Sequence, residues 1–67
     1  MRRQYLMTFV RAAERENRNA RTVVWMADCE EEDLQGRKES RILEMEQKTG
    51  EPWVCREIKI LAPWRYE

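Results

Sequence analysis

The chain has 67 residues, of which 42% are hydrophobic and 39% charged, so it forms at most one small domain and lacks the composition of a disordered chain. Its 13 basic and 13 acidic residues cancel, so it does not have the basic excess expected of most nucleic-acid-binding domains. A domain of this size buries only about 60% of the surface of its unfolded chain, so its stability depends on a few large side chains.

The composition argues against most kinds of active site. There is no His, which removes the commonest general base and metal ligand. The acidic run Glu30–Asp33 can be interpreted as a Mg²⁺ or Ca²⁺ site, but consecutive helical residues point in different directions, which favours an acidic first turn of a helix. The chain has two Gly in all, too few for a phosphate-binding loop. We therefore expect no enzymatic activity, no metal and no cofactor.

The two cysteines, Cys29 and Cys55, stand apart rather than in the close spacing of a zinc or redox site. Isolated cysteines of this kind indicate buried thiols in a reducing cytoplasm. No apolar run approaches the roughly 20 residues of a membrane span, and the first residues do not resemble a secretory signal. We expect a cytoplasmic protein without membrane contact.

The least polar window of the chain is Tyr5–Val10, which predicts a strand over about residues 4–12. Strands that are apolar on both faces lie in the centre of a sheet, with other elements covering each side. Here the alternating side chains form two mostly apolar sets, with Tyr5, Met7 and Phe9 on one face and Leu6, Thr8 and Val10 on the other.

A charged segment follows, in which Asn17 and Asn19 tolerate the left-handed backbone of a turn. We expect an extended charged hairpin, with a short helix as the alternative. The second strand is predicted over residues 21–27. Its register stays open, because a two-residue turn would place Val10 opposite Trp25, whereas a three-residue turn would shift every pair by one.

A helix is predicted over residues 28–49. Asp28 is suited to the N-cap, with Glu31 three residues later as in a capping box. Gly36 costs about 1 kcal/mol in a helix interior, so either the helix lies very close to the sheet there or it begins later. The alternative is a meander in which residues 40–47 form a strand.

The third strand is predicted over residues 53–62. Strict alternation would place Ile58 and Ile60 on the face opposite Trp53 and Cys55. An aromatic and charged tail, residues 63–67, follows Pro63, which ends the pairing.

These elements predict an α+β fold with the order β-β-α-β. A hairpin followed by a crossover helix places the third strand beside the first, which gives a three-stranded antiparallel sheet of order 2-1-3 with the helix packed on one face. The central strand then separates Cys29 from Cys55 by about two strand spacings, which is too far for a disulfide.

One helix covers only one face of such a sheet, although the first two strands are apolar on both faces. The long hairpin or the tail can cover the second face, or a partner protein or a second copy of this chain can do so. We therefore expect a small non-enzymatic module that binds a host protein, or forms a homodimer, through an apolar and aromatic sheet face with an Arg rim. The predicted contact residues are the anchors Trp25, Trp53, Trp64 and Tyr66 and the rim residues Arg18, Arg21, Arg56 and Arg65.

Single-stranded nucleic acid is the alternative partner. Positive charge beside aromatic stacking platforms is typical of single-strand binders, although the zero net charge argues against it. The residues that would take part are Arg2, Arg3, Tyr5, Phe9, Arg11, Arg15, Arg18, Arg21 and Trp25.

Three stretches carry a resemblance to a known group of proteins: residues 3–10, residues 22–34 and the final strand-like stretch 53–63. In the order of these three stretches along the sequence, the chain resembles small phage- and prophage-encoded host-takeover proteins, such as the T7-type inhibitor of bacterial RNA polymerase and some anti-CRISPR proteins. The polymerase inhibitor uses basic residues of its last strand, where this chain has Arg56 and Lys59. The resemblance implies a non-enzymatic protein that binds and blocks a host protein in the host cytoplasm.

Overall fold

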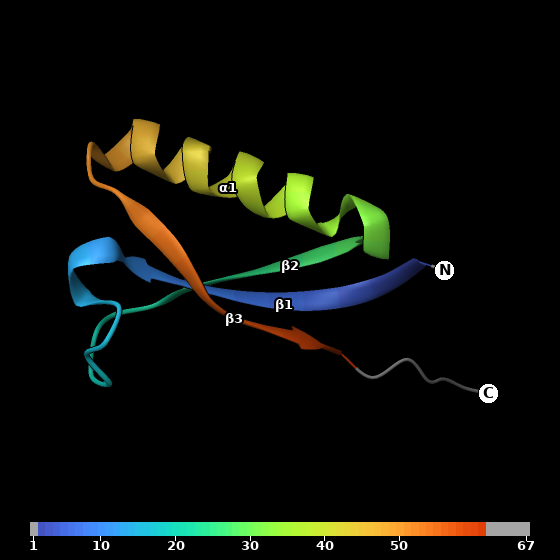
Figure 1. Ribbon diagram of the computed structural model, residues 1–67, viewed down its shortest axis with the longest axis horizontal. Helices are drawn as coiled ribbons and strands as arrows, with labels where there is room; N and C mark the ends of the chain where they lie inside the picture. The colour runs from blue at the N-terminus through green and yellow to red at the C-terminus, as the bar shows by residue number, and fades with distance from the viewer. Residues whose placement is uncertain (1, 62–67) are drawn as a thin grey trace.

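The computed structural model describes residues 2–61. The three strands β1 (Arg2–Arg11), β2 (Val23–Glu30) and β3 (Trp53–Ile60) form one antiparallel sheet of order β2-β1-β3. The helix α1 (Leu34–Thr49) connects β2 to β3 and lies on one face of the sheet (Figure 1). This confirms the predicted α+β fold and excludes the meander.

The central strand β1 divides its side chains between the two faces of the sheet. Tyr5, Met7 and Phe9 point to the face that α1 covers, where they are at most 3% exposed. The even-numbered residues point to the opposite face, which we call the open face. In the observed register Met7 lies opposite Trp25 and Phe9 opposite Val23, so neither of the tight-turn registers considered above is adopted.

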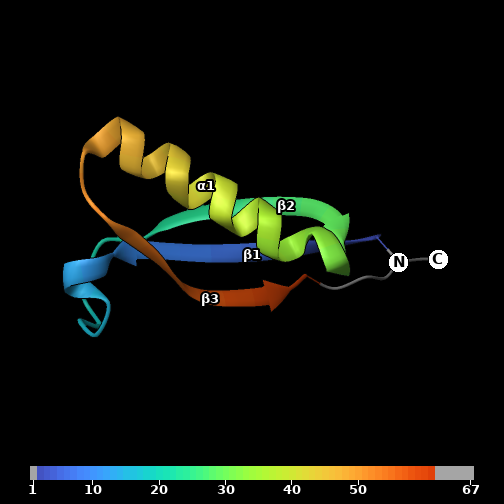
Figure 2. The same cartoon turned by 45° about the horizontal axis from the view of Figure 1, so that its top comes forward.

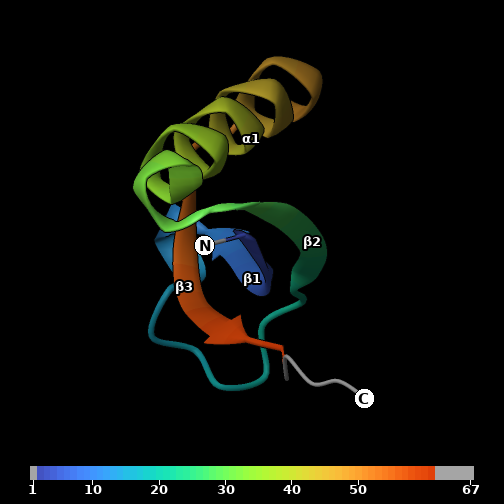
Figure 3. The same cartoon turned by 90° about the vertical axis from the view of Figure 1, so that its right-hand side faces the viewer.

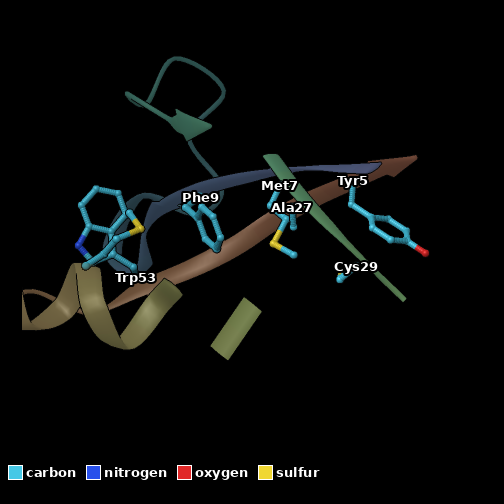
Figure 4. Close-up of a cluster of buried hydrophobic side chains, with 7 residues drawn as sticks. Tyr5, Met7, Phe9, Ala27, Cys29 and Trp53 are labelled. Carbon is cyan, nitrogen blue, oxygen red and sulfur yellow. The ribbon is translucent and has the colours of Figure 1, made fainter. Parts of the chain in front are cut away.

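The core lies between the sheet and α1 (Figure 4). Every strand and the helix contribute to it, and Met45 is the buried residue of α1. Since β2, β3 and α1 all contribute side chains that pack with those of β1, the core joins segments that are far apart in the sequence. Its buried members are Tyr5, Met7, Phe9, Ala27, Cys29, Met45 and Trp53.

The helix begins six residues later than predicted. Asp28 is part of β2, where it pairs with Gln4, and it is not a helix N-cap. The strand continues because Cys29 is 1% exposed in the core and the guanidinium of Arg2 lies 2.9 Å from the Asp28 carboxylate. Residues Glu31–Asp33 then form a 3₁₀ turn before α1 starts at Leu34. Tertiary pairing has therefore overridden the local capping pattern.

The connection between β1 and β2 is a compact loop, not the predicted extended hairpin. Residues Ala12–Glu14 form a 3₁₀ turn, and the loop continues to residue 22 (Figure 3). It folds onto the side of the sheet opposite α1, where the Asn17 carbonyl accepts a hydrogen bond of 3.0 Å from Arg56 Nη1. Val10, which points to the open face, is fully buried beside it. The loop thus covers one end of the open face.

A β-bulge changes the faces of β3. Cys55 pairs with Phe9 and Glu57 with Thr8, so Arg56 is an extra residue in the strand. Beyond the bulge, Ile58 pairs with Met7 and Ile60 with Tyr5. The prediction that the two isoleucines lie opposite Cys55 is therefore wrong, because strict alternation does not allow for an inserted residue.

The helix crosses the sheet diagonally, starting beside the end of β2 and ending beside the start of β3 (Figure 2). The second half of β3 is consequently less covered, although it lies on the helix side. Ile58 is 37% exposed and Ile60 52% exposed.

The two glycines of the chain lead to opposite predictions for the effect of alanine on stability. A Cβ atom at Gly36 would have no neighbour within 4 Å, so the helix does not lie very close to the sheet there; α1 begins at Leu34, and Gly36 lies in its first turn. Gly50 ends α1 with φ +73°, a conformation that disfavours a side chain.

We expect Gly36→Ala to raise the free energy of unfolding by about 0.5–1 kcal/mol, because Ala restricts the unfolded chain and favours the helix. Gly50→Ala should lower it by about 1 kcal/mol, because Ala would be forced into the left-handed region. Urea unfolding of both variants, followed by circular dichroism, measures the two changes. Equal effects at the two positions would contradict the assigned helix end.

Candidate functional site

All four aromatic side chains of the described residues lie on the helix side of the sheet. Tyr5 and Phe9 point to this side from β1, Trp25 lies opposite Met7, and Trp53 lies opposite Arg11. Tyr5 is 3% exposed, Phe9 is fully buried and Trp53 is 8% exposed. Within residues 2–61, the aromatic side chains therefore pack on the helix side, and none lies on the open face.

Trp53, one of the predicted anchors, holds the end of α1 against β3. Its indole Nε1 donates a 2.8 Å hydrogen bond to Thr49 Oγ1, and its backbone N–H donates to the Glu46 carboxylate at 3.2 Å. The guanidinium of Arg11 lies 5.6 Å from the ring centroid and is itself 3.0 Å from the Glu51 carboxylate. Trp53 thus stabilises the fold and is not available as a surface anchor.

Trp25, the second predicted anchor, is half-buried at the outer edge of the sheet. The guanidinium of Arg41 lies 5.4 Å from its ring centroid, and Arg41 Nη1 also donates a 2.7 Å hydrogen bond to Glu44. Ring and helix together border a shallow surface groove of about 410 Å³, which we call the β2 groove. Leu43, on its wall, is 56% exposed. The groove is lined by Trp25, Arg37, Ser40, Arg41, Leu43, Glu44 and Gln47.

The open face presents a strip of aliphatic side chains on β1 and β2. Val24 is 54% exposed and Met26 is 53% exposed. They lie opposite Thr8 and Leu6, both half-buried on the central strand. Among residues 2–61, the loop covers the strip at its Val10 end, so one of the coverings predicted for the second face is present in part; the tail, the other predicted covering, lies outside the described residues.

The predicted rim arginines have different settings. Arg18 and Arg21 are exposed on the loop before β2. Arg56 reaches the same loop through its hydrogen bond to the Asn17 carbonyl, so it helps to hold the loop in place. Trp64, Arg65 and Tyr66, which were also predicted to contact a partner, lie outside the described residues.

The exposed leucine and the aliphatic strip were not among the predicted contact residues. Leu43 has a recognisable signal, since it follows Ile42 and lies off the stripe that α1 buries through Ile42 and Met45. Val24 and Met26 alternate with the predicted anchor Trp25, so they necessarily point to the other face. Only the observed burial shows which of the two faces is covered.

The two cysteines are free thiols in different surroundings. Cys29 is buried in the core, whereas Cys55 is half-buried, with its Sγ 3.5 Å from the Glu57 carbonyl. Burial raises the pKa of the Cys55 thiol, which keeps the thiol protonated at neutral pH. Neither thiol has the environment of an activated nucleophile.

We expect alkylation of Cys55 at pH 8 to be slower in the folded protein than in the urea-unfolded chain, and Cys29 to be protected. Because the pKa of Cys55 is raised by folding, its contribution to stability is present below the unfolded pKa and is lost as the pH rises through the folded pKa. Timed labelling with iodoacetamide and peptide mass spectrometry distinguishes the two cysteines. Faster labelling of Cys55 in the folded protein would show an activated thiol instead.

Comparisons with known proteins add no relative to this geometry. No family model, curated protein or solved structure matches the chain. Within residues 2–61, no three His, Cys, Asp or Glu side chains lie together as a metal-binding group. The helix in this part of the chain is neither long nor apolar enough to cross a membrane. The exposed apolar surfaces are therefore the features from which a function can be inferred.

Proposed function

We propose that this protein is a non-enzymatic binding module that docks another protein on its open sheet face. The observation that carries the proposal is the exposed strip on this face, where Val24 and Met26 each leave more than half of their surface in water. In a domain this small, exposed aliphatic side chains side by side are typical of an interaction surface.

The residues around the strip indicate the chemistry of the partner. The strip itself is aliphatic, so it fits an apolar ridge on another protein. Arg18 and Arg21, both exposed, lie on the loop that covers one end of the same face, and Arg56 hydrogen-bonds to that loop. A partner with an apolar centre and a carboxylate-bearing border would match this arrangement. That the partner belongs to the host of a phage stays a prediction from the resemblance.

Binding of single-stranded nucleic acid has weaker support. The stacking platforms that it requires were predicted on Tyr5, Phe9 and Trp25. Tyr5 and Phe9 are buried beneath α1, and Trp25 is half-buried under the Arg41 guanidinium. The arginines of the loop remain exposed, but no aromatic side chain of the described residues accompanies them on the open face.

The test places a charge at the centre of the open face. In Leu6→Glu the new carboxylate lies opposite Lys59, which offsets it within the folded domain, but it must be desolvated when a partner docks. Ile60→Glu is the matched control, because Ile60 is 52% exposed on the other face of the sheet. We expect a protein captured from nuclease-treated bacterial lysate to be lost with Leu6→Glu and retained with Ile60→Glu.

Circular dichroism of both variants checks that they remain folded. Equal loss with the two variants, or capture that is indifferent to both, would rule out the open face as the docking surface. Oligonucleotide affinity that falls linearly with salt on logarithmic axes, and that Arg18→Ala or Arg21→Ala weakens, would instead support the nucleic-acid alternative.

A further inference from the structure

The outer edge of β2 is an unprotected strand edge in the described chain. β2 pairs with β1 on one side, and no other strand of residues 2–61 pairs with it on the other. Its eight residues, Val23–Glu30, include neither Pro nor Lys, the residues that commonly protect an edge strand. The edge therefore offers unpaired backbone groups to another strand.

Apolar side chains accompany this edge on both faces of the sheet. Val24 and Met26 lie along the edge on the open face. Trp25 and Leu43 of α1 lie on the helix side, where they line the β2 groove. Three of the five large hydrophobic side chains that are exposed in the described chain, Val24, Met26 and Leu43, thus gather around one strand edge. A strand added at this edge would cover them together.

The charges along β2 indicate which strand would fit. Arg18 and Arg21 precede the strand, whereas Glu31, Glu32 and Asp33 follow it directly. The strand is consequently basic at its start and acidic at its end. When two copies of such a strand pair antiparallel, the basic start of each lies beside the acidic end of the other. A parallel pairing would oppose like charges.

We propose that β2 pairs with β2 of a second copy of this chain, antiparallel and around a two-fold axis near Trp25. The two three-stranded sheets then join into one continuous sheet, with both α1 helices on the same face. Val24 of each copy lies beside Met26 of the other, and the two Trp25 side chains meet between the β2 grooves. This single contact would pair the backbone groups at the outer β2 edges of both copies.

This inference goes beyond the docking function, although Val24 and Met26 belong to both proposed surfaces. The dimer joins two open faces side by side and does not cover the half-buried Leu6 and Thr8 of β1. Leu43 lies on the helix side and takes no part in docking on the open face. Leu43→Glu should therefore weaken the dimer and leave partner capture unchanged, whereas Met26→Glu should weaken both.

Sedimentation equilibrium of the full chain tests the dimer. We expect a monomer–dimer equilibrium. Its dissociation constant should rise about tenfold or more in Leu43→Glu and in Met26→Glu, since each substitution would bury a charge at the contact. Ile60→Glu, on the opposite edge strand, should leave the constant unchanged. A monomer at every concentration, or an equal effect of Ile60→Glu, would overturn the proposal.

A charge exchange tests the antiparallel orientation without touching the apolar contacts. One variant carries Arg18→Glu and Arg21→Glu, and the other carries Glu31→Arg and Glu32→Arg. Each alone should dimerise more weakly than the unchanged chain, because like charges meet at both ends. Mixed together, the two variants should form a heterodimer of restored affinity, since both ends again bring opposite charges together. A mixture that stays monomeric would show that β2 does not pair in this way.

Discussion

The packing of the helix α1 against one face of β1 is the contact on which the rest of the structure depends. Met7 and Phe9 are completely buried there, and Met45 closes the space from the helix side. Apart from Val10, every buried hydrophobic residue of the described chain belongs to this cluster, so loss of this contact would remove most of the core. Because the single helix covers this face of the sheet, it cannot cover the other.

Two arginine–tryptophan contacts lie at the borders of the core between α1 and the sheet. Arg11 lies over Trp53 at the start of β3, and Arg41 lies over Trp25 at the outer edge of β2. In both cases a nearby carboxylate, from Glu51 or Glu44, pairs with the guanidinium. Because Trp25 and Trp53 are used in this way, the apolar side chains left exposed in residues 2–61 are aliphatic on the open face and mixed with polar ones at the β2 groove.

The order of the elements and the central position of β1 were predicted from local patterns, and the structure confirms them. The start of the helix was not, because Asp28 satisfies the capping pattern but is held in β2 by its pairing with Gln4 and by Arg2. Trp53 shows the same limit for the candidate site. It was predicted to be an aromatic anchor for a partner, but it packs in the core, where it donates a hydrogen bond to Thr49 and lies under Arg11.

The sequence alone determined the succession of strands and helix and the two-sided apolar character of β1, since these properties depend on residues a few positions apart. Only the tertiary structure decided the strand register, the bulge at Arg56 and the face that α1 covers. These features depend on contacts between segments distant in the chain, and one inserted residue is enough to place Ile58 and Ile60 on the other face. The exposure of Val24 and Met26, from which the proposed docking surface follows, is a consequence of that choice of face.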